Sequence, residues 1–320
     1  IYIPLPSHSR KRLEGRLRAR LDIDANRFAP MLILSLLVGA ALAVPSNWCG
    51  NRALTSEHRE TIQSLRVAES TGISLHRRQS GNSSSTINVP VYMNAVVNTT
   101  DSEDMLSETV LKSQFEVLSD RFAPYNITFT LKSANRMIDD DNSKGFDYYG
   151  WNSFKAAQRK GDYGTLNLYY VTNMDDQTWG SGSCTLPGDA SGGPLVTMLD
   201  GCTMAAYTVP GGVSAGKTYK GEITVHEVGH WFSLLHTFYG EDCTGPGDYI
   251  DDTPQEAVWE LNVCPIGRDS CPDQPGLDPI TNYMDYAGEG CWTEFTPGQI
   301  ERMHNAYWTL RAPSSVSKRG

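Results

Sequence analysis

Three histidines lie within the short stretch Thr224-Val-His-Glu-Val-Gly-His-Trp-Phe-Ser-Leu-Leu-His236. His226 and His230 are four residues apart, so on a helix both imidazoles face the same side and can hold one metal ion. If the helix continued, His236 would point about 240° away from that side. The helix must therefore end between His230 and His236 for the third imidazole to reach the ion.

Three imidazoles with one open coordination position are typical of catalytic zinc, whereas structural zinc sites are closed by four ligands, usually including cysteine. Glu227 lies about 100° round the helix from His226, beside the ion rather than on it. That is where a carboxylate can take a proton from zinc-bound water. A surface histidine pair without a ligand role is the alternative, and the third histidine argues against it.

A second signal lies downstream, in Asn282-Tyr-Met-Asp-Tyr286. A methionine in a tight turn below the zinc accompanies the long histidine motif in metzincins, so Met284 is predicted to support the histidines from below. The Tyr286 hydroxyl is predicted to point at the zinc and steady the oxyanion. Ordinary core packing is the alternative for both side chains.

The N-terminal part is predicted to be processed. Residues 31–43 run from Met31 through an apolar core to Ala41-Leu-Ala43, which is typical of a signal peptide and predicts a secreted, extracellular protein. A buried core helix is the alternative, and the run is too short to span a bilayer. Residues 1–30 are basic, and we interpret them as an upstream extension rather than a long signal region.

Residues 44–78 are predicted to be a propeptide. Ser56 to Ser70 has helical spacing, and the Arg77-Arg78 pair is followed by a polar, Ser- and Gly-rich run. A processing protease reaches such a segment easily, although a solvated charge pair is the alternative. The catalytic domain would then be residues 79–320.

The main body, residues 79–320, holds 15 basic and 31 acidic side chains. So acidic a body is a poor candidate for nucleic acid or anionic membranes, and neither is an expected partner. Its hydrophobic patterns predict one mixed α/β unit. The expected strands are 87–97, 127–131, 165–171 and an edge strand at 204–209; the expected helices are 103–121, capped by Ser102, and 151–159, with a long loop at 180–193.

These motifs together resemble the pappalysin type of metzincin zinc metallopeptidase, most closely the secreted extracellular metalloproteases of fungi. The matching segments are His226 to Phe238, Gly247 to Pro254, Asn282 to Tyr286 and Cys291 to Gln299. The resemblance implies an α+β fold. An upper subdomain holds a twisted sheet and the zinc helix, and a lower, loop-rich subdomain ends in a helix. Thr296-Pro-Gly-Gln299 agrees, because it reads as a capping box with Pro at the first helical position.

The resemblance also implies which of the seven cysteines form disulfides. It implies the pairs Cys243–Cys271 and Cys264–Cys291 and leaves Cys184 and Cys202 as a third pair, where sequence alone allows 15 pairings of six cysteines. Cys49 remains in the predicted propeptide. Our hypothesis is a cysteine switch in which its thiolate fills the fourth zinc position; an incidental thiol is the alternative. Three triplets fit the N-glycosylation pattern, at Asn82, Asn98 and Asn126.

Oxygen-bearing side chains follow the zinc helix, and by resemblance they are candidate calcium ligands: Asp248, Asp251, Asp252 and Thr253. Ordinary turn capping by aspartate explains them about as well. Ser233 departs from the family pattern, because metalloproteases with this spacing usually have glycine there. A non-glycine residue in that turn costs roughly 1–2 kcal/mol.

The sequence therefore predicts a zinc-dependent endopeptidase that hydrolyses protein or peptide substrates, with Glu227 as general base acting on a zinc-activated water. The substrate is expected to lie extended along the 204–209 edge strand. Ala287 to Gly290 and Trp292 are expected to shape the pocket after the scissile bond. The rival hypothesis, based on Ser233, is a catalytically impaired zinc-binding protein that holds a partner in the cleft.

Overall fold

The computed structural model describes residues 54–71, 86–145, 150–174, 180–188 and 194–312. All of these lie in one compact unit, residues 46–320. Within these ranges no helix has both the length and the apolar character needed to cross a membrane. The expectations for residues 1–43, Cys49, Asn82 and Arg77-Arg78 fall outside the described residues.

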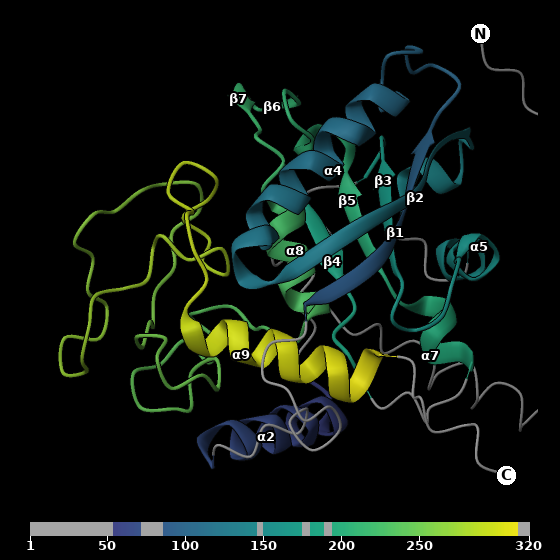
Figure 1. The fold of residues 1–320 in the computed structure, drawn as a ribbon. Helices are drawn as coiled ribbons and strands as arrows, with labels where there is room; N and C mark the ends of the chain where they lie inside the picture. Colours follow the sequence, from purple (N-terminus) through teal and green to yellow (C-terminus); the bar gives the residue numbers. More distant parts are fainter. Residues whose placement is uncertain (1–53, 72–85, 146–149, 175–179, 189–193, 313–320) are drawn as a thin grey trace, which may run out of the picture. The chain divides into compact units, whose positions relative to one another are not determined.

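A five-stranded sheet forms the centre of the fold, in the order β2-β1-β3-β5-β4 (Figure 1). Its strands are β1 (Ile87–Val97), β2 (Ile127–Ile138), β3 (Leu166–Val171), β4 (Gly182–Cys184) and β5 (Cys202–Ala205). The first three neighbouring pairs are parallel, and only β4 runs antiparallel, against β5. The register places Val91 opposite Leu166 and Leu168 opposite Cys202.

Alternating side chains of the strands serve two cores on opposite faces of the sheet, as the period of two requires. Leu168 and Tyr170 of β3 join the large core that includes α4 (Glu108–Phe122) and α8 (Ile223–Trp231). Tyr169 and Val171 instead join a smaller core with α5 (Gly150–Gln158). The sheet therefore carries α8 on one face and is closed by α5 on the other (Figure 1).

The chain between α8 and α9 (Pro297–Ala306) is built from turns and loops, with one isolated bridge between Asn282 and Glu294. Disulfides hold it at Cys243–Cys271 and Cys264–Cys291, the pairs that the resemblance implies. The third pair, Cys184–Cys202, joins β4 to β5.

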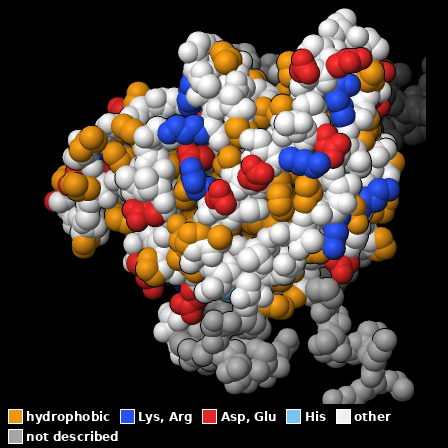
Figure 2. All heavy atoms as spheres, turned by 45° about the horizontal axis from the view of Figure 1, so that its top comes forward, with side chains coloured by type: hydrophobic (Ala, Val, Ile, Leu, Met, Phe, Trp, Pro, Cys, Tyr) orange, Lys and Arg blue, Asp and Glu red, His pale blue; other side chains and the backbone are white. Residues whose placement is uncertain are grey.

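Helix α9 starts with the predicted capping box of Thr296 and Gln299. It continues as the π-helix η5 (Tyr307–Arg311). The α+β class and the division into a sheet half and a loop-rich half are confirmed. Acidic and basic side chains lie interspersed on the face seen in Figure 2.

The remaining elements are short: the 3-10 turns η1 (Ala123–Tyr125), η2 (Asn142–Lys144) and η4 (Ala206–Thr208), helix α7 (Pro194–Leu199), and the hairpin of β6 (Val213–Ser214) and β7 (Lys217–Thr218). Helix α2 (Ser56–Ser70) falls within the predicted propeptide and lies beside α9 (Figure 1).

Three element predictions are wrong in detail. The strand expected at 127–131 extends to Ile138. The first helix starts at Glu108 rather than 103, because the hydroxyl of Ser107 accepts the Val110 N–H as the N-cap and Leu106 has φ 51°. The predicted edge strand 204–209 is wrong, since β5 ends at Ala205 and lies inside the sheet. The edge on this side of the sheet is β4, which falls within the predicted 180–193 loop and is too short to show periodicity.

Candidate metal centre

His226 and His230 lie on α8 and are buried. The Nδ1 atom of His226 donates to the carbonyl of Tyr283 at 2.6 Å, and that of His230 donates to the carbonyl of Leu234 at 2.8 Å. Carbonyl oxygens only accept, so both rings carry their proton on Nδ1 and present a lone pair on Nε2. The backbone thus fixes the tautomer that ligates through Nε2.

The helix ends in a turn that returns the chain toward these rings. Ser233 has φ 79°, its N–H donates to the His230 carbonyl at 2.9 Å, and the Leu234 N–H donates to the Gly229 carbonyl at 3.0 Å. This is the Schellman pattern of two C-terminal hydrogen bonds, with serine at the position that glycine usually holds. The expected turn therefore forms at Ser233 and lets His236 leave the helical path.

All three imidazoles converge. His236 Nε2 lies 3.1 Å from the Nε2 atoms of both His226 and His230. Among the described residues, only these three form a group whose ligand atoms all lie within 4.8 Å of one another. A tetrahedral zinc with Zn–N bonds of about 2.0–2.1 Å separates its ligand nitrogens by roughly 3.3 Å, so the spacing fits zinc.

The protonation state fits the same conclusion. Burial lowers the pKa of His230 to about 4, and burial followed by the neighbouring histidines lowers the pKa of His226 and His236 well below the usual value. Neutral rings with lone pairs facing one another repel unless a cation lies between them. The donor set therefore suits a divalent metal that prefers imidazole, which supports zinc.

Glu227 is buried at the boundary between the zinc helix and the edge strand β4. A Cβ built on Gly182 would lie 2.8 Å from both Cγ and Oε1 of Glu227. The carboxylate thus lies against the β4 backbone, and only glycine at position 182 leaves it room. Its predicted position beside the metal stays a prediction.

Met284 lies directly under the zinc helix. A Cβ on Gly229 would approach its Sδ atom to 2.5 Å, so the helix backbone rests on the thioether. Its N–H donates to the Asn282 side chain at 2.9 Å, and its carbonyl accepts from Thr237 at 3.3 Å. The sequence stretch from Asn282 thus forms a tight turn that touches both ends of the histidine motif.

Aromatic rings enclose the ligands. The Tyr286 ring packs edge-on against His236 at 4.6 Å, and Trp292 stacks on His226 at 5.5 Å. Phe238 stacks on His236 at 4.9 Å, a role that sequence reasoning missed. Its only sequence signal is an aromatic residue two positions after a ligand.

Glu289 caps the start of α8, a role that sequence reasoning also missed. The helix has no side-chain cap of its own, and the Glu289 carboxylate accepts the N–H groups of Lys220, Glu222 and Ile223 at 2.7, 2.6 and 3.1 Å. This buried carboxylate satisfies donors that a helix N-terminus leaves open. The loop after the methionine turn is thereby fastened to α8.

A buried acidic cluster binds the hydroxyl of Thr237, the residue after His236. The hydroxyl of Thr237 donates to Glu256 at 2.6 Å, and Arg268 pairs with Glu256 and with Asp278. Burial and the neighbouring Asp285 raise the pKa of Glu256 to about 9. Nothing in the sequence pattern marks this cluster, because its members come from separate loops.

The candidate calcium ligands do not converge in the described residues. Asp252 accepts from Thr296 Oγ1 and the Gly298 N–H, both at 2.7 Å, which caps α9. Asp251 pairs with Arg66 at 2.7 Å. Asp248 is buried, and burial raises its pKa to about 7. Turn capping thus accounts for Asp252 in this structure.

The chain is similar to a known protein family and to proteins of known type. Residues 165–307 match the family model Peptidase M43, pregnancy-associated plasma protein-A. The chain is 40% identical to an extracellular metalloprotease of Podospora anserina over 88% of this chain and 97% of the relative. An extracellular metalloprotease of Colletotrichum graminicola is also 40% identical, over 82% of this chain and 90% of the relative.

Solved structures give the same fold. Mature mirolysin of Tannerella forsythia, in complex with a cleaved peptide, matches with TM-score 0.57 and 26% identity over 69% of this chain and 92% of mirolysin. A promirolysin mutant matches with TM-score 0.60 and 22% identity, over 83% of this chain and 95% of that protein.

Proposed function

Because the chain belongs to the pappalysin family of metallopeptidases, peptidase family M43, we propose that Glu227 is the general base of its peptide-bond hydrolysis. The protein is an extracellular zinc metalloprotease with a three-histidine zinc site, and its substrates are proteins. The observation that carries the proposal is the convergence of His226, His230 and His236. The buried Glu227 follows His226 directly in α8.

Bound zinc would supply Lewis acidity toward a water and the scissile carbonyl. Glu227 takes the proton of the attacking water and passes it to the leaving amine. Its place against Gly182 restricts its rotamers, which holds the carboxylate against the β4 backbone. Tyr286, packed against His236, is proposed to help stabilise the oxyanion through its hydroxyl.

We propose that the substrate lies along β4 rather than along the 204–209 segment. Strand β4 is one of the two outer strands of the sheet, and it carries Gly182, whose backbone adjoins Glu227. An extended peptide added at this edge would pass its backbone beside the general base. The short β4 then acts as the template that sets substrate register.

The test compares the processed form, residues 79–320, with its Glu227→Gln variant, and with Glu260→Gln as a matched change at an exposed glutamate. Casein cleavage and zinc content are measured on all three proteins. Zinc in each, with cleavage lost only in E227Q, is the expected result. Cleavage by E227Q at the parental rate would contradict the role of Glu227. Zinc without cleavage in the parent would favour the partner-holding alternative.

Latency is proposed to come from residues 44–78. Leu54, just before α2, packs in one cluster with Leu235, the neighbour of ligand His236. Four residues lie between Cys49 and Leu54, so an extended chain spans at most about 18 Å from one to the other. The Cys49 thiolate is proposed to occupy the open zinc position in the zymogen. Cys49→Ser is expected to be active before processing; unchanged latency in C49S would refute the switch.

Two modifications complete the proposal. Glycosylation is proposed at Asn82, Asn98 and Asn126, of which Asn126 is exposed, and a mass loss on deglycosylation tests it. Calcium is proposed only at the buried Asp248, beside Thr253, where a cation would stabilise a carboxylate that burial disfavours. Calcium should then raise the Tm of the parent and leave that of Asp248→Asn unchanged.

A further inference from the structure

Helix α2 presents a partly apolar face to the body of the protein. Ile62, Leu65 and Ala68 are buried, while Val67 on the other face is 62% exposed. Ile62 packs with Leu235 and Tyr249. The helix therefore rests on residues close to the metal centre and on the loop that follows it.

The C-terminal end of α2 holds a buried ion pair with α9. Arg302 is completely buried, and its Nε and Nη2 atoms donate to the Glu69 carboxylate in three contacts of 2.8 to 3.1 Å. Its other acceptor is the carbonyl of Tyr249 at 2.8 Å. Without Glu69, this guanidinium would remain buried with a single backbone acceptor, which is strongly unfavourable.

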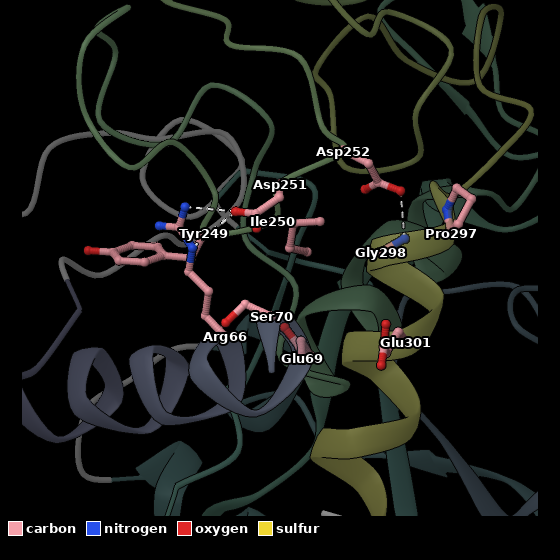
Figure 3. Close-up of a pocket in the computed structure, with 10 residues that line it drawn as sticks. All are labelled: Arg66, Glu69, Ser70, Tyr249, Ile250, Asp251, Asp252, Pro297, Gly298 and Glu301. Atoms are coloured by element: carbon pink, nitrogen blue, oxygen red, sulfur yellow. Dashed lines mark hydrogen bonds and ion pairs between the residues drawn. The ribbon is translucent and has the colours of Figure 1, made fainter. Parts of the chain in front are cut away.

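The interface between α2 and the body around this ion pair is less tightly packed than a protein core. A cavity of about 290 Å³ lies between α2, the loop 249–252 and the start of α9, and Asp251, Asp252 and Glu301 line it (Figure 3). Arg66 reaches across its rim to Asp251, but both side chains of this pair are exposed, 40% and 65%. The contact between α2 and the body thus resembles an interface that can separate, with the Glu69–Arg302 ion pair as its one strong polar contact.

We propose that residues 54–71 stay bound to the catalytic body after the chain is cut near Arg77-Arg78, held by Glu69 on Arg302. The groove is then a binding site for an amphipathic helix with a glutamate near its C-terminal end, and its occupant is the cut propeptide. Release of this helix becomes a step separate from the cut. The inference rests on the propeptide assignment of the proposed function.

The test uses the full chain with a recognition sequence for an added specific protease in place of residues 79–85, in the Glu227→Gln background to prevent autolysis. After cutting, size exclusion at successive dilutions measures how much of the fragment co-elutes with the body. We expect retention in the parent and a dissociation constant at least about 30-fold higher in Glu69→Gln.

Matched variants on the same helix distinguish the effect of the Glu69–Arg302 pair from that of other charges on α2. Glu60→Gln makes the same change at an exposed glutamate and should not alter retention. Arg66→Gln removes the exposed pair and should weaken retention less than about 5-fold. Equal dissociation of E69Q and E60Q, or a parental fragment that separates at micromolar concentration, would overturn the proposal.

The added protease site keeps this result independent of natural processing. If the secreted parent is never cut near Arg77-Arg78, the propeptide assignment fails while retention is still measured. If the body isolated from an active chain, with Glu227 intact, binds zinc but cleaves no casein, the peptidase assignment fails and the retention result still stands.

Discussion

Replacing Ser233 with glycine is expected to stabilise the protein. Ser233 sits at φ 79°, where a side chain costs roughly 1–2 kcal/mol. Glycine also lowers the free energy of unfolding by about 0.5–1 kcal/mol, because it makes the unfolded chain more flexible. The net gain is about 0.5–1 kcal/mol, or a Tm increase of roughly 1–4 °C for a domain of this size.

Thermal unfolding in the Glu227→Gln background measures this gain without autolysis. Ser119→Gly is the control, because it makes the same chemical change inside α4 and should cost roughly 0.5 kcal/mol. Casein cleavage by S233G with Glu227 intact should equal that of the parent, since the Schellman turn already places His236. If S233G and S119G lower Tm alike, the strain argument at Ser233 is refuted.

Further perturbations probe other parts of the site and fold. Gly182→Ala should lower kcat at least about tenfold at unchanged zinc content, because its Cβ displaces Glu227; parental kcat would contradict this packing. Without calcium, stability should fall as pH rises from about 4 to about 7. Because the pKa of Asp248 is raised, the folded state holds a proton there that the unfolded state has already lost. The rise from 3.8 to about 7 limits the contribution of this proton to the free energy of unfolding to at most roughly 4 kcal/mol. Asp248→Asn should therefore flatten the Tm–pH curve. Replacing Cys243 and Cys271 together by alanine should cost roughly 2–4 kcal/mol, measured by denaturant unfolding, and a smaller loss would show that the loop half is held mainly by its buried ion pairs.

The sequence alone predicted the zinc site well because its spacing is local. His226 and His230 are one helical turn apart, and the ending of the helix before His236 follows from geometry. The capping box at Thr296 is equally local, and its prediction is confirmed. Such features need no knowledge of distant residues.

Features that depend on distant residues were missed or misplaced. Ser102 and Ser107 are both acceptable caps, and only the backbone at Leu106 decides between them. The edge role of β4 depends on sheet order, which three residues cannot encode. The contact of Glu69 with Arg302 joins residues 233 positions apart and has no sequence pattern at all.

The carboxylate of Glu289 links two tasks that are usually considered apart. It belongs to the 287–290 stretch expected to shape substrate preference, yet it also secures the first turn of the zinc helix. A substitution at Glu289 would therefore change selectivity and metal retention together. Attempts to retarget this enzyme would do better to vary the neighbouring Gly290, where a Cβ meets nothing within 4 Å, and to leave Glu289 in place.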